Sequence, residues 1–156
     1  MFEIKWTDRE DMETATQECF QDIQGIDEII RLQNTLFKSN DHTVCFGDAQ
    51  IDGLEYPPNH DRLTVYICYN DDDNYEIHYV IDFFNPEIEY FDIEFNTHWI
   101  DDVTIQKNAD GKYSISFGSG ECDFRYSSAK VNRCWIRSGH RNYANAEEYL
   151  KSLGKS

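Results

Sequence analysis

The strongest constraint on the fold is an alternation of apolar and other residues with a period of two. In residues 62–69 every second residue is apolar, so that in a strand these side chains would lie on one face. Residues 75–84 show the same pattern. This alternation is typical of a strand that buries one face. Residues 70–74 are all Asn or Asp, a composition typical of a hairpin loop. The sequence therefore predicts two adjacent antiparallel strands, each with one face in a core and one face in solvent.

Several shorter segments extend this pattern. Residues 87–96 alternate with a change of phase at Tyr90 and Phe91, which indicates a bulge or bend. Residues 103–107 and 113–117 flank an Asp110-Gly111 turn and predict a second hairpin. Further strands are expected at 122–126 and 131–137. Seven or eight consecutive strands of this kind favour a mainly antiparallel bent sheet or β-sandwich.

Helices are expected near both ends of the chain. Residues 7–24 are predicted to be helical, with Thr7 as N-cap and Glu10 at capping-box spacing. Gly25 separates them from a second helix at 26–37, and a short helix is expected at 145–154. Residues 1–6 are a further short strand candidate. The predicted class is α+β in one domain, 1–156, with a helical part at 1–40 and an antiparallel β core at 45–137.

The composition provides enough apolar surface for such a core. The chain has 156 residues, which suits one domain. Its mean hydropathy is low, at −0.70. Ten Phe, ten Tyr and three Trp offset this, because one aromatic side chain buries roughly 150–250 Å². The sequence thus predicts a folded protein.

The charge of the chain is its clearest indication of function. Thirty acidic and 14 basic residues give a net charge of −16. Residues 1–123 contain 28 acids and 7 bases, whereas residues 124–156 contain 2 acids and 7 bases. The electrostatic field of such a negative charge repels nucleic acids and anionic membranes and attracts cationic proteins. We therefore expect a basic protein partner, no nucleic acid and no membrane, with the bases after residue 123 paired internally with the acidic face.

The cysteines predict a reducing compartment. There are five, with no Cys-x-x-Cys spacing, and the N-terminal residues lack the pattern of a secretory signal. No apolar run is long enough to span a membrane. The sequence predicts a cytoplasmic protein with free thiols.

Motifs that carry chemistry are missing from the sequence. The five histidines are 18 or more residues apart, and the acids from Asp71 onward lack the Gly and Glu of a calcium-binding loop. Neither a G-x-S-x-G elbow nor a glycine-rich phosphate loop occurs. We therefore predict no enzyme activity, no catalytic residue, no cofactor and no metal. A metal ligand set or a Cys–His pair assembled through the fold stays open.

The acids of the predicted sheet are the candidate partner-binding residues. They lie in the first hairpin, on the strand after it, and before the strand at 103–107, interleaved with aromatic residues. Such a surface can complement a partner rich in Lys and Arg. The competing interpretation is an ordinary solvated strand and loop. The predicted contact residues are Asp71, Asp72, Asp73, Glu76, Glu87, Glu89, Asp92, Glu94, Asp101 and Asp102.

The segments within residues 45–136 also resemble a known family. Residues 45–55 contain a Phe46-x-Asp48-Ala49 turn before a first strand, and an acidic strand follows at 88–95. Further matching patterns are Leu-Thr-Val in the strand at 61–67 and the segments 115–117, 122–124 and 129–131. These features resemble small β-rich immunity proteins of bacterial polymorphic toxin and contact-dependent growth inhibition systems. The resemblance implies a cytosolic protein that binds one toxin domain, often a nuclease, and blocks its active site.

Charge and resemblance together predict an immunity protein, or antitoxin, that covers a cognate basic toxin domain as a monomer in a 1:1 complex. A first alternative is an acidic adaptor or nucleic-acid mimic for another basic protein. A second alternative is a small enzyme whose site is assembled from scattered residues.

Overall fold

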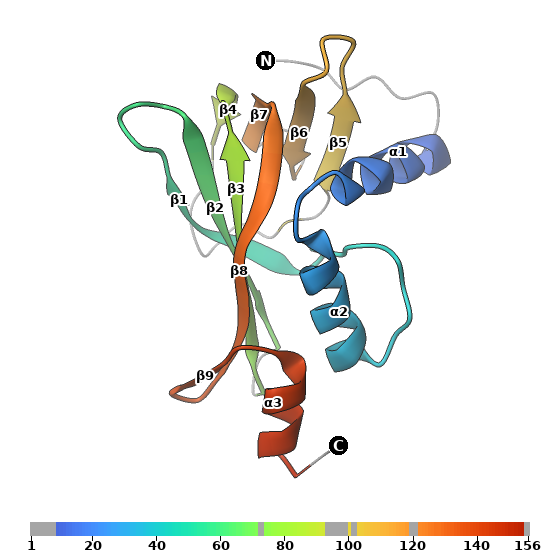
Figure 1. Cartoon of the computed structure of the whole chain (residues 1–156), viewed down its shortest axis with the longest axis vertical. Helices are drawn as coiled ribbons and strands as arrows, with labels where there is room; N and C mark the ends of the chain where they lie inside the picture. The colour runs from blue at the N-terminus through green and yellow to red at the C-terminus, as the bar shows by residue number, and fades with distance from the viewer. Residues whose placement is uncertain (1–8, 72–73, 93–99, 101–102, 119–121, 155–156) are drawn as a thin grey trace.

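The computed structural model describes residues 9–71, 74–92, 100, 103–118 and 122–154. Within them the chain forms an α+β fold, with helices near the N-terminus and a short helix near the C-terminus (Figure 1). The predicted fold class is thereby confirmed. The helices are α1 (Arg9–Gln21), α2 (Ile26–Phe37) and α3 (Ala146–Ser152).

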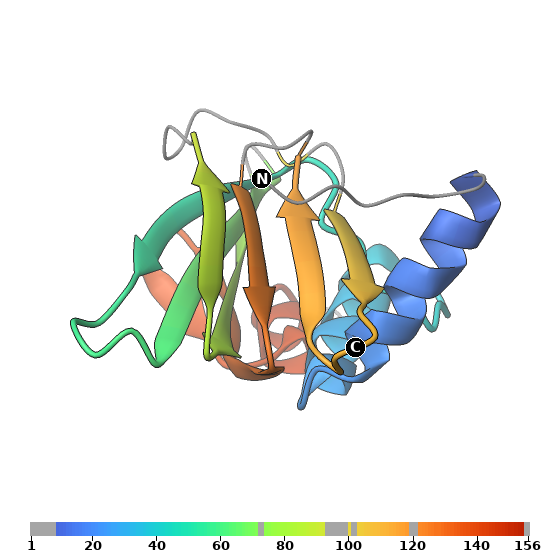
Figure 2. The ribbon, with the colours of Figure 1, turned by 90° about the horizontal axis from the view of Figure 1, so that it is seen from above.

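The strands of the described residues form two antiparallel sheets. A five-stranded sheet has the order β1-β2-β3-β8-β9, and a four-stranded sheet has the order β4-β7-β6-β5. Figure 2 shows the four strands side by side, with α1 next to β5. The strands are β1 (Ala49–Glu55), β2 (Arg62–Asn70), β3 (Glu76–Phe84), β4 (Glu87–Phe91), β5 (Val103–Lys107), β6 (Tyr113–Phe117), β7 (Cys122–Tyr126), β8 (Ser128–Ser138) and β9 (Arg141–Tyr143).

The two sheets are joined at a corner where two paired strands pass from one sheet into the other. β3 continues into β4 across Asn85 and Pro86, and β7 continues into β8 across Ser127. The Ser127 N–H donates to the Phe84 carbonyl over 3.0 Å, and Asn85 Nδ2 donates to Ser127 Oγ over 2.8 Å. Asn85 has a φ of 53°, a left-handed conformation that Asn tolerates better than most residues. These bonds hold both strands in the bend.

Aromatic rings inside this corner form part of the core. The Phe83 ring lies 5.0 Å from the Phe124 ring and 4.9 Å from the Tyr126 ring, in edge-to-face contacts. All three side chains are fully buried. The apolar faces predicted for the first two strands also enter this core, as shown by the buried residues Leu63, Val65, Ile67, Ile77, Tyr79 and Ile81.

The opposite face of β2 and β3 differs from the expectation of a solvated surface. Thr64 and Asp82 lie on that face, and both are buried. Thr64 Oγ1 donates to Asp82 Oδ1 over 2.5 Å, and Asn132 Nδ2 donates to Asp82 Oδ2 over 2.9 Å. A buried carboxylate requires such partners, because it has lost its water. The expectation was therefore wrong at this position of the sheet.

The first helix packs along the edge of the four-stranded sheet at β5. The Ile105 N–H donates to Thr16 Oγ1 over 3.3 Å, so a side chain of α1 satisfies the backbone of β5. Gly25 then separates the two helices as predicted. Its φ is 84°, and an added Cβ would lie 3.3 Å from Val131 Cβ of β8. Glycine is therefore favoured here by both backbone conformation and space.

The second helix has the predicted bounds, and it contacts α3. Arg31 of α2 forms an ion pair with Glu147 of α3, with 2.7 Å between Nη2 and Oε1. Asn145 caps α3, since its Oδ1 accepts from the Glu148 N–H over 2.9 Å. The proposed N-cap Thr7 and the strand candidate at 1–6 lie outside the described residues.

Most strand predictions are confirmed, with four differences. The predicted strand at 87–96 is observed as β4, which ends at Phe91, and its predicted residues 93–96 lie outside the described part. Its register shift lies between Ile88 and Tyr90, slightly before the predicted position. β8 begins at Ser128, three residues earlier than predicted, and β9 was not predicted.

Candidate functional site

The predicted acidic contacts separate into two groups in the structure. Asp71 and Glu76 lie at the hairpin end of β3, whereas Glu87 and Glu89 lie on β4, beyond the other end of β3. At a rise of about 3.3 Å per residue, β3 alone spans about 26 Å. The structure therefore does not bring the two groups together. Asp92 directly follows β4, and Asp72, Asp73, Glu94, Asp101 and Asp102 lie outside the described residues.

The two described acids at the hairpin end take part in local hydrogen bonds. Asn74 Nδ2 donates to Asp71 Oδ2 over 2.9 Å, and the Asn74 N–H donates to the Asp71 carbonyl. Glu76 Oε2 lies 2.9 Å from His78 Nε2. Asp71 is therefore part of the turn itself, and Glu76 already has a neighbour on its own strand.

The first acid of β4 is neutralised by bases of the same sheet. Glu87 Oε2 lies 3.4 Å from Arg125 Nη1 and 3.4 Å from Lys112 Nζ. Arg125 also binds Asp110, with 2.5 Å between Nη2 and Oδ2. The backbone N–H of Lys112, and then the Arg125 guanidinium, lower the pKa of Asp110 below its usual value. This network leaves Glu87 with little uncompensated charge for a partner.

The basic residues of β8 and β9 depart from the expected internal pairing. Arg125 is ion-paired as predicted. Among the described residues, however, no acid forms an ion pair with Lys130, Arg133, Arg137 or Arg141, which are all exposed. Three of these bases, Lys130, Arg133 and Arg137, lie on β8 on the face opposite its buried residues, so they form a basic stripe on the outer face of the five-stranded sheet. Arg141 lies on β9, where it pairs with Ser138. The expectation of internal pairing was wrong for these four bases.

An acidic surface that the sequence analysis did not assign lies on the first two helices. Residues 10–30 contain seven acids and no base. Five of the acids have exposed side chains on or beside α1 and α2, namely Glu13, Glu18, Asp22, Asp27 and Glu28. We call these five residues the helical acidic face. The signal for this surface in the sequence is the long run of residues without a base.

A groove of about 620 Å³ runs along this face of α1. The side chains of α1 are linked to the segment that follows α2, because Gln21 Nε2 donates to the His42 carbonyl over 3.2 Å. The groove is lined by Glu13, Thr14, Gln17, Glu18, Gln21, His42 and Thr43. It combines two carboxylates with amide and hydroxyl groups, a set of side chains suited to a cationic group.

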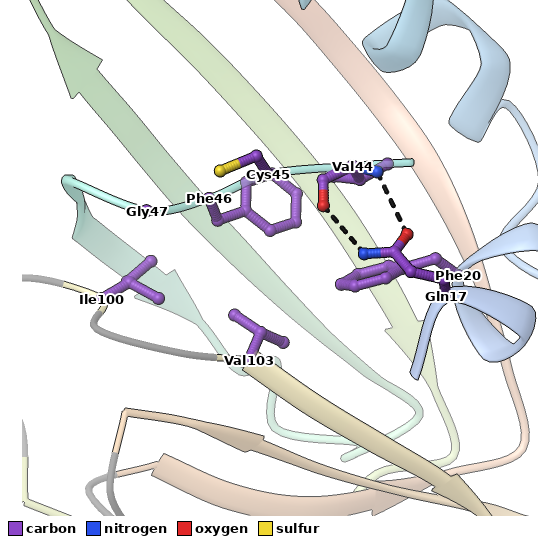
Figure 3. A pocket seen from close by; sticks show the side chains of 8 residues that line it. All are labelled: Gln17, Phe20, Val44, Cys45, Phe46, Gly47, Ile100 and Val103. Carbon is purple, nitrogen blue, oxygen red and sulfur yellow. Dashed lines mark hydrogen bonds between the residues drawn. The ribbon is translucent and has the colours of Figure 1, made fainter. Parts of the chain in front are cut away.

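A smaller hollow of about 160 Å³ lies next to this groove and is lined by Gln17, by residues 44–47 and by Phe20, Ile100 and Val103 (Figure 3). The Gln17 amide donates from Nε2 to the Val44 carbonyl and accepts at Oε1 from the Val44 N–H, each over 3.1 Å. Gln33 of α2 binds the backbone of Cys45 in the same way, over 2.7 and 3.2 Å. Two glutamine side chains therefore form the backbone hydrogen bonds that a neighbouring strand would otherwise form with this extended segment.

The thiols of the protein are free, and most are protonated at neutral pH. None of the five described cysteines forms a disulfide, as predicted. Burial raises the pKa of Cys134 to about 11 and that of Cys68 to about 12, and it also raises the pKa values of Cys19 and Cys122. Cys45 is exposed at the hollow. The four buried or half-buried thiols therefore lack the thiolate that nucleophilic catalysis requires.

Comparison of the chain with protein-family models, with curated proteins and with solved structures finds no match. In the part of the chain that the structure describes, none of the helices combines the length and the apolar character needed to cross a membrane.

Proposed function

We propose that this protein is an acidic binding protein for a cationic protein partner, and that it serves as an immunity protein. In this proposal it acts in the cytoplasm and covers the active site of a cognate basic toxin domain, such as a nuclease, in a 1:1 complex. The net charge of −16 supports a cationic partner. The resemblance of segments within residues 45–136 to bacterial immunity proteins supports the toxin as that partner.

The observation that carries the proposal is the helical acidic face. Its acids are exposed on or beside two helices that pack on the sheets, and residues 10–30 of the chain contain no base. The basic stripe lies elsewhere, on the outer face of β8, whereas α2 lies against Val131 and Cys134 on the inner side of that strand. Negative charge on a fixed surface accelerates encounter with a cationic partner.

The groove on α1 supplies an anchor point within this face. A Lys or Arg side chain of the partner that enters the groove meets the carboxylates of Glu13 and Glu18. Charge-assisted hydrogen bonds of this kind are about twice as strong as neutral ones. A few such anchors set the dissociation rate of an interface, while the surrounding charge sets the association rate.

The acids predicted from the sheet remain candidate contacts. A standard interface covers about 800 Å² on each partner. Because the hairpin and β4 groups lie at opposite ends of β3, one interface of that size is expected to be centred on at most one of them. The pairing of Glu87 with Arg125 and Lys112 makes the β4 group the weaker candidate.

The experiment is co-purification with the product of the neighbouring gene, followed by an activity assay of the isolated toxin domain. Stoichiometric inhibition by the parent protein is expected. The double variant Glu18→Lys/Asp27→Lys is expected to inhibit at higher concentration than the matched control Asp52→Lys/Asp61→Lys, which changes the net charge by the same amount. Binding without inhibition would support the adaptor alternative. A parent protein that binds neither this product nor other cationic proteins would overturn the proposal.

A further inference from the structure

Three side chains with metal-binding atoms meet on the outer face of the five-stranded sheet. They are Cys68 of β2 and Glu76 and His78 of β3. The Cys68 thiol sulfur, a carboxylate oxygen of Glu76 and a ring nitrogen of His78 all lie within 4.8 Å of one another. All three residues are half-buried. The group is separate from the helical acidic face. Of its three members, the proposed function uses Glu76 alone, as a candidate contact at the hairpin end of β3.

The register of the sheet brings these residues together. Cys68 and His78 are direct cross-strand partners, and Glu76 lies two residues before His78 on the same face. β1 pairs with β2 at Cys68, and β8 pairs with β3 at His78, so neither strand is free at this point. A site on paired central strands is more rigid than one on loops.

The His78 ring is also fixed by its neighbours. It stacks on the Trp135 ring of β8, with 4.8 Å between ring centroids and 8° between ring planes. The Arg133 guanidinium lies over the same Trp135 ring, 4.2 Å from its centroid. These contacts orient the imidazole along the sheet, where its Nε2 reaches Glu76 Oε2 at 2.9 Å. Outer contacts that hold a histidine in position are a regular feature of metal sites.

The geometry fits a tetrahedral zinc ion after small movements. Typical bond lengths to zinc place nitrogen and oxygen ligands about 3.3 Å apart, and sulfur and nitrogen ligands about 3.6 Å apart. The Nε2 to Oε2 distance of 2.9 Å is already close to the first value. With every pair of donor atoms inside 4.8 Å, side-chain movements of about 1 Å or less are sufficient.

From these observations we infer that Cys68, Glu76 and His78 form a zinc-binding site. A thiolate, an imidazole and a carboxylate are the three side-chain ligand types that zinc accepts, and three protein ligands leave a fourth position for water. Zinc binding releases the thiol proton of Cys68 to solvent, and the ion takes the place of the hydrogen bond between His78 Nε2 and Glu76 Oε2. The thiolate and imidazole ligands favour zinc over magnesium and calcium, which prefer oxygen ligands.

The test uses the full chain without an added histidine tag, freed of metal with a chelator. Cobalt(II) serves as the optical probe, because a cobalt–thiolate bond produces a charge-transfer absorption band. The expected result is a band that saturates at one cobalt per chain and disappears when zinc is added. Absence of the band in the parent protein would overturn the inference, leaving Glu76 and His78 as a hydrogen-bonded pair beside a thiol.

Variants assign the ligands. Cys68→Ser is expected to abolish the charge-transfer band, and His78→Ala and Glu76→Gln are each expected to weaken zinc binding at least about tenfold. The matched control is Cys45→Ser, which removes an exposed thiol and is expected to keep the band. Glu76 is not fully buried, so Glu76→Gln tests the site even if His78→Ala fails to fold. Loss of the band in Cys45→Ser together with its retention in Cys68→Ser would contradict the assignment.

Discussion

The Tyr113 hydroxyl donates a hydrogen bond to the Asp22 carboxylate, with 2.6 Å between the two oxygens. Tyr113 is the first residue of β6, and Asp22 directly follows α1. The bond therefore attaches the end of an acidic helix to the four-stranded sheet. Burial, and then the hydrogen bond and charge of Asp22, raise the pKa of Tyr113 to about 12.

Replacing this tyrosine tests the attachment. Tyr113→Phe is expected to lower the free energy of unfolding at pH 7 by about 1 kcal/mol, the usual value of one hydrogen bond. The folded-state pKa is raised above the unfolded value near 10, so the contribution is present below pH 10 and is lost as pH rises through about 12. Urea unfolding from pH 7 to 12 measures both effects. An exposed control, Tyr56→Phe, is expected to leave stability unchanged.

Gln33 is expected to contribute more to stability than Gln17, although both bind the backbone of the same extended segment. Gln33 is buried, and its Nε2 also donates to the Tyr79 hydroxyl over 3.0 Å. Gln33→Leu leaves these buried groups without partners, so a loss of about 2–4 kcal/mol is expected. Gln17→Leu, at a half-buried position, is expected to cost about 1 kcal/mol. Equal losses in chemical denaturation would contradict this account of the segment.

Phe83 occupies the corner where the two sheets meet, and its ring contacts β6 and β7. Phe83→Ala is expected to lower the free energy of unfolding by about 3–5 kcal/mol, because it removes buried ring contacts and leaves a cavity. Phe37→Ala serves as the control, since Phe37 is exposed at 42% and is expected to cost far less. Thermal and urea unfolding of the two variants compare the sites directly. Similar losses would show that the corner is not a central part of the core.

Most helices and strands could be predicted from the sequence because the residues that determine them lie within the element or next to it. Gly25, with its positive φ, lies directly before the second helix, and the alternation in residues 62–69 indicates a strand with one face in the core. Contacts between residues that are far apart along the chain left no such pattern in the sequence. Asp82 is buried because Thr64 and Asn132 approach it from adjacent strands, which the alternation alone cannot report.

The same reasoning explains the outcome for the candidate sites. The predicted loop at 70–74 pairs residue 69 with residue 75 and therefore Cys68 with Glu76, whereas the observed register pairs Cys68 with His78. The closeness of these three residues was nevertheless accessible from the sequence. It was missed because metal motifs are searched by spacing along the chain. Whether Arg133 and Arg137 form ion pairs with acids of the described residues depends on which strands lie beside β8, and this information is missing from a single sequence.

Thiol labelling distinguishes the exposed cysteine from the others. At neutral pH one thiol, Cys45, is expected to react rapidly with a thiol reagent, because the pKa values of Cys19, Cys122 and Cys134 are raised by burial. Mass spectrometry locates the label, and Cys45→Ser is expected to remove the fast phase. Fast labelling at Cys122, which is buried, would mean that the four-stranded sheet opens readily.

The most direct test of the acidic-face account is the association rate of the protein with the product of the neighbouring gene, measured by stopped flow at low and at physiological salt. The account predicts that Glu18→Lys/Asp27→Lys associates about tenfold or more slowly than the parent at low salt, and that the difference shrinks as salt rises. The control Asp52→Lys/Asp61→Lys is expected to change the rate less. If the parent and both double variants associate equally fast at low salt, the helical acidic face does not guide the partner and the account is wrong.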